Sequence, residues 1–272
     1  MLLTVIIAEI SEPKQPFMLQ GQPYAESLKK AAACGYEGIE IQLRRPQDID
    51  EEFFDLCDSL HLRLTSIATG LAVRDGLSLS SPDEALRERS VRHVCDMIDL
   101  SNRSRQRPDV VIGLMSGSGR DCPDRESFLH NLGGSLKAIS DYAAGKDIRV
   151  GLEPVNHIDC PEGLNTWDDA VALLDRYDCS QIFLTLDLYH MGIDEKDIPA
   201  SIRRYGHRVK SVQLTDRNRQ TPGRGDFDFG PILEAIKSTG YDGPIIMECL
   251  PLPDADTALQ EAAAFYHREF QA

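Results

Sequence analysis

Four polar residues in the second half of the chain come at the ends of apolar runs that have the length of β-strands. They are Glu153 in "GLEP", Asp187 in "LTLD", Gln213 in "SVQL" and Glu248 in "IIME". Their positions are 34, 26 and 35 residues apart, about the length of one strand and one helix in each case. We therefore expect successive parallel strands to present these side chains at one edge, where they could act together.

The alternation of side chains along these runs indicates which way the four residues point. Side chains two positions apart lie on the same face of a strand, and the positions beside the four residues are mostly aliphatic, such as Leu152, Leu186 and Met247. The aliphatic face must pack against helices, so the polar face points to the other side of the sheet. Three carboxylates gathered in a half-buried place repel one another unless a cation or shared protons compensate.

A divalent cation is the simplest compensation for such a cluster. Carboxylate and amide oxygens form a hard donor set, which favours Mg²⁺ or Mn²⁺ over Zn²⁺ or copper. We predict that Glu153, Asp187, Gln213 and Glu248 bind this metal and leave coordination positions for a substrate or water. The alternative is that one or two of them only form hydrogen bonds to the backbone or to an arginine across the mouth.

Other polar residues follow the first two of these strands closely. His190 lies three positions after the second of the four residues and can reach the same mouth, and His157 has the parallel place after the first. Asn156 and Asp159, in the same loop as His157, could bind substrate hydroxyl groups. Simple solvation of these loop residues is the competing interpretation.

Short apolar runs alternate with amphipathic stretches along the whole chain, and this order predicts the scaffold. The expected strands cover residues 3–9, 38–43, 63–69, 109–115, 149–155, 182–187, 209–215 and 244–250. Helical spacing is found in residues 24–35, which end at Gly35, and in residues 165–178, which open with a Thr166-x-x-Asp169 capping pattern. Eight such units over about 250 residues predict an α/β fold, a (β/α)8 TIM barrel with residues 1–272 as a single domain. A doubly wound sheet is the structural alternative.

Two segments of the chain echo each other weakly. They are "GYEGIEIQ" (residues 35–42) and "GYDGPIIME" (residues 240–248), and both lead from a Gly-Tyr-acid-Gly turn into a strand that carries a glutamate. Shared turn chemistry explains the echo, since the first glycine can end a helix and the second can open a strand. The echo supports a repeating unit and predicts no function.

The bulk composition excludes several classes of partner. Of the 272 residues 42% are hydrophobic, and the formal net charge is −15. This charge repels phosphate backbones and anionic lipids, so neither nucleic acid nor a membrane is an expected partner. Seven cysteines occur singly without a CxxC pair, and no segment approaches the roughly 18 apolar residues of a membrane span. We expect a cytoplasmic protein with reduced thiols.

The stretch from Val209 to Gly230 combines glycines and arginines but is not a phosphate-binding P-loop, because it lacks the GxxxxGK[ST] pattern. We interpret it as the seventh strand and its loop, with Asp216 and Arg219 at the rim. Glycines 223 and 225 would let this loop turn closely past the mouth.

The segments "GLEPVNHIDCPEGLNT", "LTLDLYHMG" and the whole stretch from Val209 to Pro251 resemble the xylose isomerase-like TIM barrel superfamily. This superfamily contains sugar and sugar-phosphate isomerases and epimerases, including the tagatose and psicose 3-epimerases, and the resemblance covers most of the chain. Its metal ligands are Glu, Asp, His and Glu from the last four strands, which match Glu153, Asp187, Gln213 and Glu248. The usual His is replaced by Gln213, as in the hydroxypyruvate isomerases of the superfamily.

The resemblance implies aldose–ketose isomerisation or epimerisation through an enediolate, with Glu153 and Glu248 as the acid/base pair beside the metal. It also implies that His190 and Arg219 contact the substrate, and it matches Asp159 to an acidic loop residue of the family. The expected partner is a small sugar, sugar phosphate or keto acid. Because related barrels often associate, a homo-oligomer is a further expectation.

Three other functions fit the same architecture. A dehydroshikimate dehydratase-like lyase would use a similar metal and proton abstraction but expel water. A non-catalytic carbohydrate-binding barrel is opposed by the three acidic residues that remain. The apurinic endonucleases use many strand-end histidines and bind DNA, which the few histidines and the negative charge of this chain argue against.

Overall fold

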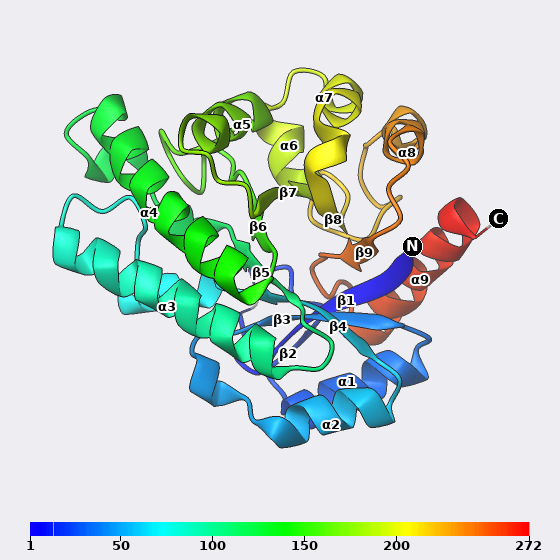
Figure 1. Ribbon diagram of the computed structural model, residues 1–272. Coiled ribbons are helices and arrows are strands. Elements are labelled where there is room, and N and C mark those ends of the chain that lie inside the picture. The colour runs from blue at the N-terminus through cyan, green and yellow to red at the C-terminus, as the bar shows by residue number, and fades with distance from the viewer. Residues whose placement is uncertain (13, 272) are drawn as a thin grey trace.

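The computed structural model describes residues 1–12 and 14–271 and shows a closed barrel of parallel strands surrounded by helices (Figure 1). The strands follow the order β2-β1-β3-β4-β5-β6-β7-β8-β9, and β1 also pairs with β9, which closes the sheet. Their bounds are β1 Leu2–Ala8, β2 Leu19–Gln20, β3 Gly38–Gln42, β4 Arg63–Ala68, β5 Asp109–Ile112, β6 Val150–Leu152, β7 Ile182–Asp187, β8 Val209–Leu214 and β9 Pro244–Met247. The eight predicted strands are confirmed, and the two-residue β2 beside β1 was not predicted.

Helices follow the strands of the barrel and lie on its outside (Figure 1). Their bounds are α1 Tyr24–Ala33, α2 Glu51–Ser59, α3 Glu84–Arg103, α4 Arg125–Lys146, α5 Trp167–Arg176, α6 Leu188–Asp194, α7 Ile198–Tyr205, α8 Phe229–Ser238 and α9 Ala255–Phe270. The predicted capping pattern at α5 is present, because the Thr166 side chain accepts the Asp169 backbone N–H. Gly35 follows α1 with a φ of 79°, a left-handed conformation that glycine adopts without steric cost.

The strands bury different side chains on their two faces, as the alternation predicted. Leu152, Leu186 and Met247 belong to the large apolar core between the sheet and the helices. A second, small apolar cluster consists of Ile6, Ala8, Phe17, Leu71 and Ile246. The members of β1 and β9 in this cluster, Ile6, Ala8 and Ile246, alternate along their strands with residues of the outer core, so the small cluster lies inside the barrel. The barrel interior therefore presents a different set of side chains from the helix-facing core.

Two further observations bear on the composition. All seven cysteines are unpaired in the structure, which fits the absence of a CxxC pattern. Among the described residues, no helix combines the length and apolar character needed to cross a bilayer.

Candidate active site

The structure brings the four polar strand-end residues to one end of the barrel. Glu153 comes directly after β6, Asp187 is the last residue of β7, Gln213 lies in β8 and Glu248 comes directly after β9. Asp187 and Gln213 are register partners in neighbouring strands, and the Glu248 backbone N–H donates to Leu214 O at 3.1 Å. Because all the strands are parallel, these positions meet at the carboxyl edge of the sheet, where TIM barrels build their sites.

The two carboxylate oxygens of Asp187 have different partners: one caps a helix and the other faces the site. Oδ1 accepts the backbone N–H of Tyr189 at 2.7 Å and that of His190 at 3.3 Å, which caps α6. Oδ2 lies 3.0 Å from Arg219 Nη1 and 3.4 Å from His190 Nε2. Burial alone would raise the pKa of Asp187, but the charge of Arg219 and the neighbouring His190 outweigh burial and lower this pKa. Asp187 is therefore held as a carboxylate.

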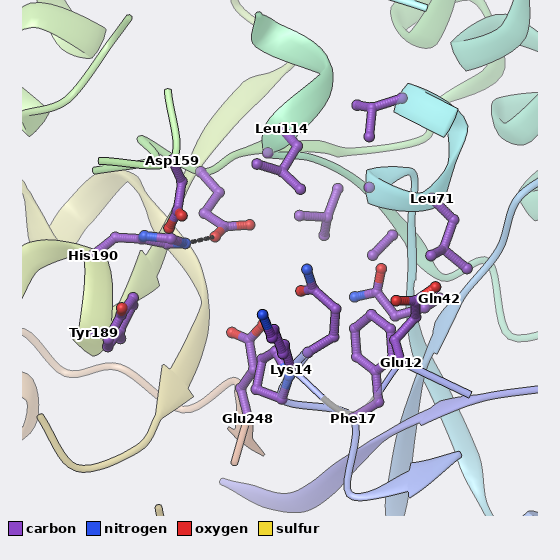
Figure 2. Close-up of a pocket in the computed structure, with 18 of the residues that line it drawn as sticks. Glu12, Lys14, Phe17, Gln42, Leu71, Leu114, Asp159, Tyr189, His190 and Glu248 are labelled. Atoms are coloured by element: carbon purple, nitrogen blue, oxygen red, sulfur yellow. Dashed lines mark ion pairs between the residues drawn. The ribbon is translucent and has the colours of Figure 1, made fainter. Parts of the chain in front are cut away.

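His190 lies between the first two strand-end carboxylates. Its Nε2 is 3.1 Å from Glu153 Oε1, the ion pair drawn in Figure 2. Its Nδ1 accepts the backbone N–H of Asn156 at 3.3 Å and also contacts the Asn156 side-chain amide nitrogen at 2.6 Å. With two donors on Nδ1, the ring proton belongs on Nε2, so His190 is set to donate a hydrogen bond into the site.

Asn156 is buried behind His190 and is absent from the cavity lining. Besides contacting His190, its amide nitrogen donates to Asp159 Oδ2 at 2.8 Å. Its Oδ1 accepts the backbone N–H groups of Ile158 and Asp159. The polar atoms of Asn156 thus hold the loop and the His190 ring. Its direct contact with substrate stays a prediction that these hydrogen bonds do not support. His157, in contrast, is exposed and pairs with Asp194.

Arg219 is partly buried in the site, although we expected it at the rim. Only 14% of its side chain is exposed, and Nη1 lies 3.0 Å from Asp187 Oδ2 and 3.4 Å from Glu248 Oε2. The guanidinium also stacks over the Tyr189 ring at 4.2 Å. These carboxylates raise the pKa of Arg219 against the opposing effect of burial. Two of the four strand-end residues, Asp187 and Glu248, therefore contact an arginine across the mouth.

The loop that carries Arg219 is organised by Asp216, which is fully buried and not at the rim as we expected. Asp216 Oδ2 accepts the Gly223 backbone N–H at 2.8 Å, and Oδ1 accepts that of Phe227 at 3.1 Å. Gly223 has a φ of 98°, and a Cβ on Gly225 would lie 2.3 Å from Asp216 Oδ1. The two glycines let the loop wrap around one carboxylate.

Gln213 points its two amide ends in different directions. Nε2 donates to Glu40 Oε1 at 3.1 Å, whereas Oε1 is buried without a hydrogen-bond partner among the described residues. Glu40 lies in β3 and is itself fully buried, with Ser66 Oγ donating to its other oxygen. Burial raises the pKa of Glu40 to about 7. The sequence did contain a signal for Glu40, a lone acid within the apolar run of the echoed "GYEGIEIQ" segment.

The donor set of this site fits a divalent cation. Ligand atoms of Glu153, Asp187 and His190 lie within 4.8 Å of one another. Among residues 1–12 and 14–271, Gln213 Oε1 and Glu248 Oε2 are buried oxygens without a hydrogen-bond partner, although Arg219 lies near the second. Burial raises the pKa of Glu248 well above its usual range, and the charges of Asp187 and Glu153 act in the same direction. A cation would relieve this repulsion and satisfy the open oxygens.

A cavity of about 240 Å³ opens over this cluster. Figure 2 shows Asp159, His190 and Glu248 on one side of it and Phe17, Gln42 and Leu71 on the other. Glu153 and Arg219 also line it, whereas Asp187 and Gln213 are buried and do not. The cavity therefore has one end over the strand-end cluster and a second end that combines apolar and amide side chains with the paired Glu12 and Arg74.

Comparison with known proteins gives sugar epimerases and isomerases among the relatives. The family model described as xylose isomerase-like TIM barrel matches residues 28–268. An L-ribulose 3-epimerase from Methylomonas sp. (strain DH-1) is 30% identical over 230 residues, which cover 82% of this chain and 77% of the relative. The hydroxypyruvate isomerase of Escherichia coli (strain K12) is 23% identical over 250 residues, 89% of this chain and 94% of the relative.

The solved structures agree on the fold. The D-psicose 3-epimerase of Clostridium cellulolyticum H10, solved with D-tagatose, superposes with a TM-score of 0.82 at 20% identity and covers 99% of both chains. The closed parallel barrel is thus shared with this enzyme. The chain belongs to the xylose isomerase-like TIM barrel family.

Proposed function

We propose that this protein is a divalent-metal-dependent sugar epimerase that inverts a ketose at the carbon next to its carbonyl. The observation that carries the proposal is the placement of two glutamates. Glu153 and Glu248 both line the cavity, and they come from β6 and β9, with the buried Asp187 and Gln213 on the two strands between them. A substrate in the cavity would therefore have a carboxylate on each side. The relatives, which include an L-ribulose 3-epimerase, point to the same class of reaction.

The cation would be held by Glu153, Asp187, Gln213 and Glu248, and Mn²⁺ or Mg²⁺ suits their oxygen atoms. When bound, it would offset the negative charge that develops on the substrate oxygens after proton removal. Gln213 and Glu248 each contribute a buried oxygen that lacks a hydrogen-bond partner in the described chain.

We assign the two proton transfers of the reaction to Glu153 and Glu248. One carboxylate removes the proton from the carbon next to the carbonyl and leaves an enediolate, and the other returns a proton to the opposite face of that carbon. Inversion at one carbon requires groups on both faces, which the separation of β6 and β9 provides. Return of the proton to the neighbouring carbon would give isomerisation instead.

Other residues would hold the substrate. His190 Nε2–H and the Arg219 guanidinium are donors that line the charged end of the cavity, and Asp159 is an acceptor at its mouth. At the other end, Gln42 offers an amide, while Phe17 and Leu71 offer apolar surface for the C–H faces of a sugar. Arg74 at this end is paired with Glu12, and Lys14 also lines the cavity. An unphosphorylated sugar is expected because the relative named above is an L-ribulose 3-epimerase.

A second candidate activity is hydroxypyruvate isomerisation. It is favoured by Gln213, which resembles the third ligand of the hydroxypyruvate isomerases, and by a relative with this activity that matches over most of its length. None of the relatives named above is a lyase, and the dehydratase alternative is not favoured.

A substrate panel tests the proposal and distinguishes ketose epimerisation from hydroxypyruvate isomerisation. Purified protein loaded with Mn²⁺ would be incubated with ketopentoses, ketohexoses, their phosphates and hydroxypyruvate, and products would be separated by chromatography. We expect inversion of an unphosphorylated ketose and loss of this turnover after chelation with EDTA. Turnover of hydroxypyruvate alone would select the second candidate. An inactive panel from folded, metal-loaded protein would overturn the proposal.

The Gly113→Ala substitution should reduce activity without unfolding the protein. A Cβ at Gly113 would lie 2.6 Å from Glu153 Oε2, so the carboxylate must move, and it can do so cheaply at the end of a flexible side chain. A displacement of about 1 Å can cost on the order of 100-fold in rate, so we expect a fall of about that size in kcat. The melting temperature should change little.

Gly134→Ala in α4 is the matched control, because a Cβ there meets nothing within 4 Å. Its kcat should equal that of the parent. Full activity in the Gly113→Ala protein would show that the position of the Glu153 carboxylate does not limit the reaction.

A further inference from the structure

Glu40 is a buried acid inside the barrel that contacts a metal-binding candidate but does not line the cavity. In β3 it is the register partner of Ile6 in β1 and of Ser66 in β4. Its Oε2 accepts a hydrogen bond from Ser66 Oγ, and its Oε1 accepts one from Gln213 Nε2 at 3.1 Å. Both oxygens are thus engaged, and neither is directed at the substrate space. Its direct contact with the metal-binding candidates is the one with Gln213, and its charge also acts through space on Glu153 and Asp187.

The contact matters because the two ends of the Gln213 side chain differ chemically. A carboxylate offers an oxygen at either end, whereas a glutamine offers one ligating oxygen and one NH₂ group that cannot bind a cation. The orientation of the amide therefore decides whether Gln213 is a ligand at all. In the structure the NH₂ group faces Glu40, and Oε1 is the end without a hydrogen-bond partner in the described chain.

The reverse orientation is disfavoured by Glu40. Turning the amide by 180° would lose the hydrogen bond from Nε2 and bring Gln213 Oε1 against Glu40 Oε1, an unfavourable contact of two acceptors whenever Glu40 is ionised. Ser66 stabilises the arrangement from the other side, because its hydroxyl donates to the second oxygen of Glu40 and holds the carboxyl group in place. A buried oxygen that is kept free of partners in this way is available for a ligand.

We propose that Glu40 is a positioning residue that orients the Gln213 amide so that its oxygen faces the cation site. This assignment rests on the proposed function, since it supposes a cation among the strand-end residues. Groups that orient a metal ligand typically change metal affinity by about 10- to 100-fold when they are removed. Glu40 acts on the cation through Gln213 and not by touching the substrate.

Mn²⁺ affinity, measured by calorimetry or by the EPR signal of free Mn²⁺, tests the assignment without reference to activity. Glu40→Leu removes the acceptor for the Gln213 NH₂ group and should weaken Mn²⁺ binding about 10- to 100-fold. Glu40→Gln removes the charge but keeps an oxygen that can accept from Gln213, since its own NH₂ group can donate to Ser66 Oγ. Its Mn²⁺ affinity should stay within about threefold of the parent.

Two further variants provide the controls. Ser66→Ala removes the other hydrogen bond of Glu40 and leaves the Gln213 contact intact, so its effect on Mn²⁺ affinity should be smaller than that of Glu40→Leu. In a Gln213→Leu background, which has no amide to orient, Glu40→Leu should change the remaining affinity less than about twofold. This double-mutant cycle separates an effect through Gln213 from a general effect of the cavity. Melting temperatures would confirm that each variant is folded.

The outcomes distinguish this assignment from the proposed function. If the parent binds Mn²⁺ and a folded Glu40→Leu protein binds it equally well, the positioning role is wrong and the proposed function stands. If Glu40→Gln is as weak as Glu40→Leu, the charge of Glu40 and not its orienting contact is responsible, and the assignment is also overturned. If the parent itself binds no Mn²⁺, the metal dependence of the proposed function fails and this assignment fails with it.

Discussion

Replacing either Glu153 or Glu248 with glutamine is expected to lower kcat on the substrate ketose by about 100- to 10,000-fold. Each change removes one proton-transferring group, and such groups typically contribute that much to the rate. Because the two residues act in the same reaction from opposite sides, the double variant should be little slower than either single one. Chromatographic assay of product in the presence of saturating Mn²⁺ gives the measurement.

The control is Glu162→Gln, the same chemical change in the loop that follows Glu153. Glu162 is exposed and pairs with the equally exposed Arg120. Its kcat should stay within about twofold of the parent, since exposed ion pairs contribute little. If the Glu153→Gln or the Glu248→Gln protein has the parental kcat, the substituted residue takes no part in the proton transfer.

Arg219→Met is expected to destabilise the protein in the absence of metal and to make its stability strongly dependent on Mn²⁺. Arg219 is the cation that faces Asp187 and Glu248 in the structure, and the site around it is buried. Removing one partner from a buried ion pair costs roughly 3 kcal/mol or more, which lowers Tm by on the order of 10 °C in a chain of this size. Added Mn²⁺ should restore more stability to the variant than to the parent, because it replaces the missing charge and no guanidinium competes with it.

Arg176→Met is the matched control for this experiment. Arg176 also pairs with a carboxylate, Glu126, and also stacks over a tyrosine, Tyr177, but its ion pair is exposed. Its loss should leave the Tm nearly unchanged, with or without Mn²⁺, because exposed ion pairs contribute little to stability. Thermal melts of the parent and of both variants, each in EDTA and in Mn²⁺, give the Tm values to compare. A Tm for Arg219→Met in EDTA within about 2 °C of the parent would contradict the electrostatic description of the site.

The barrel could be predicted from the sequence because its signals are repeated and local. Each of the eight runs is apolar and of strand length, and four of them end in a polar residue one strand–helix unit after the previous one. In a parallel sheet such positions must meet at one edge, so the grouping of Glu153, Asp187 and Glu248 followed from spacing alone. The strands end earlier than predicted at several of these places, where the chain turns into the loops that line the cavity.

The parts that the sequence did not reveal depend on tertiary contacts. Arg219 sits in the polar stretch "TDRNRQ", which reads as a solvated loop, and only the wrapping of that loop around Asp216 brings it into the barrel. Asn156 is polar and near the mouth, yet it faces His190 from behind. Glu40 and Gln213 are 173 positions apart, and their contact exists only after β1 and β9 close the barrel.

In the proposed reaction, one carboxylate removes the proton from the carbon next to the carbonyl, and a second carboxyl group returns a proton to that carbon. Turnover of the substrate ketose in ²H₂O with Mn²⁺, followed by NMR of the product, tests it most directly. We predict one deuterium at the inverted carbon in the product of the parent protein, because the carboxyl groups exchange their protons with solvent. Glu153→Gln and Glu248→Gln should each slow formation of the inverted product by about 100- to 10,000-fold. An inverted product without deuterium would contradict the account, because it would mean that the hydrogen never passes through an exchangeable group.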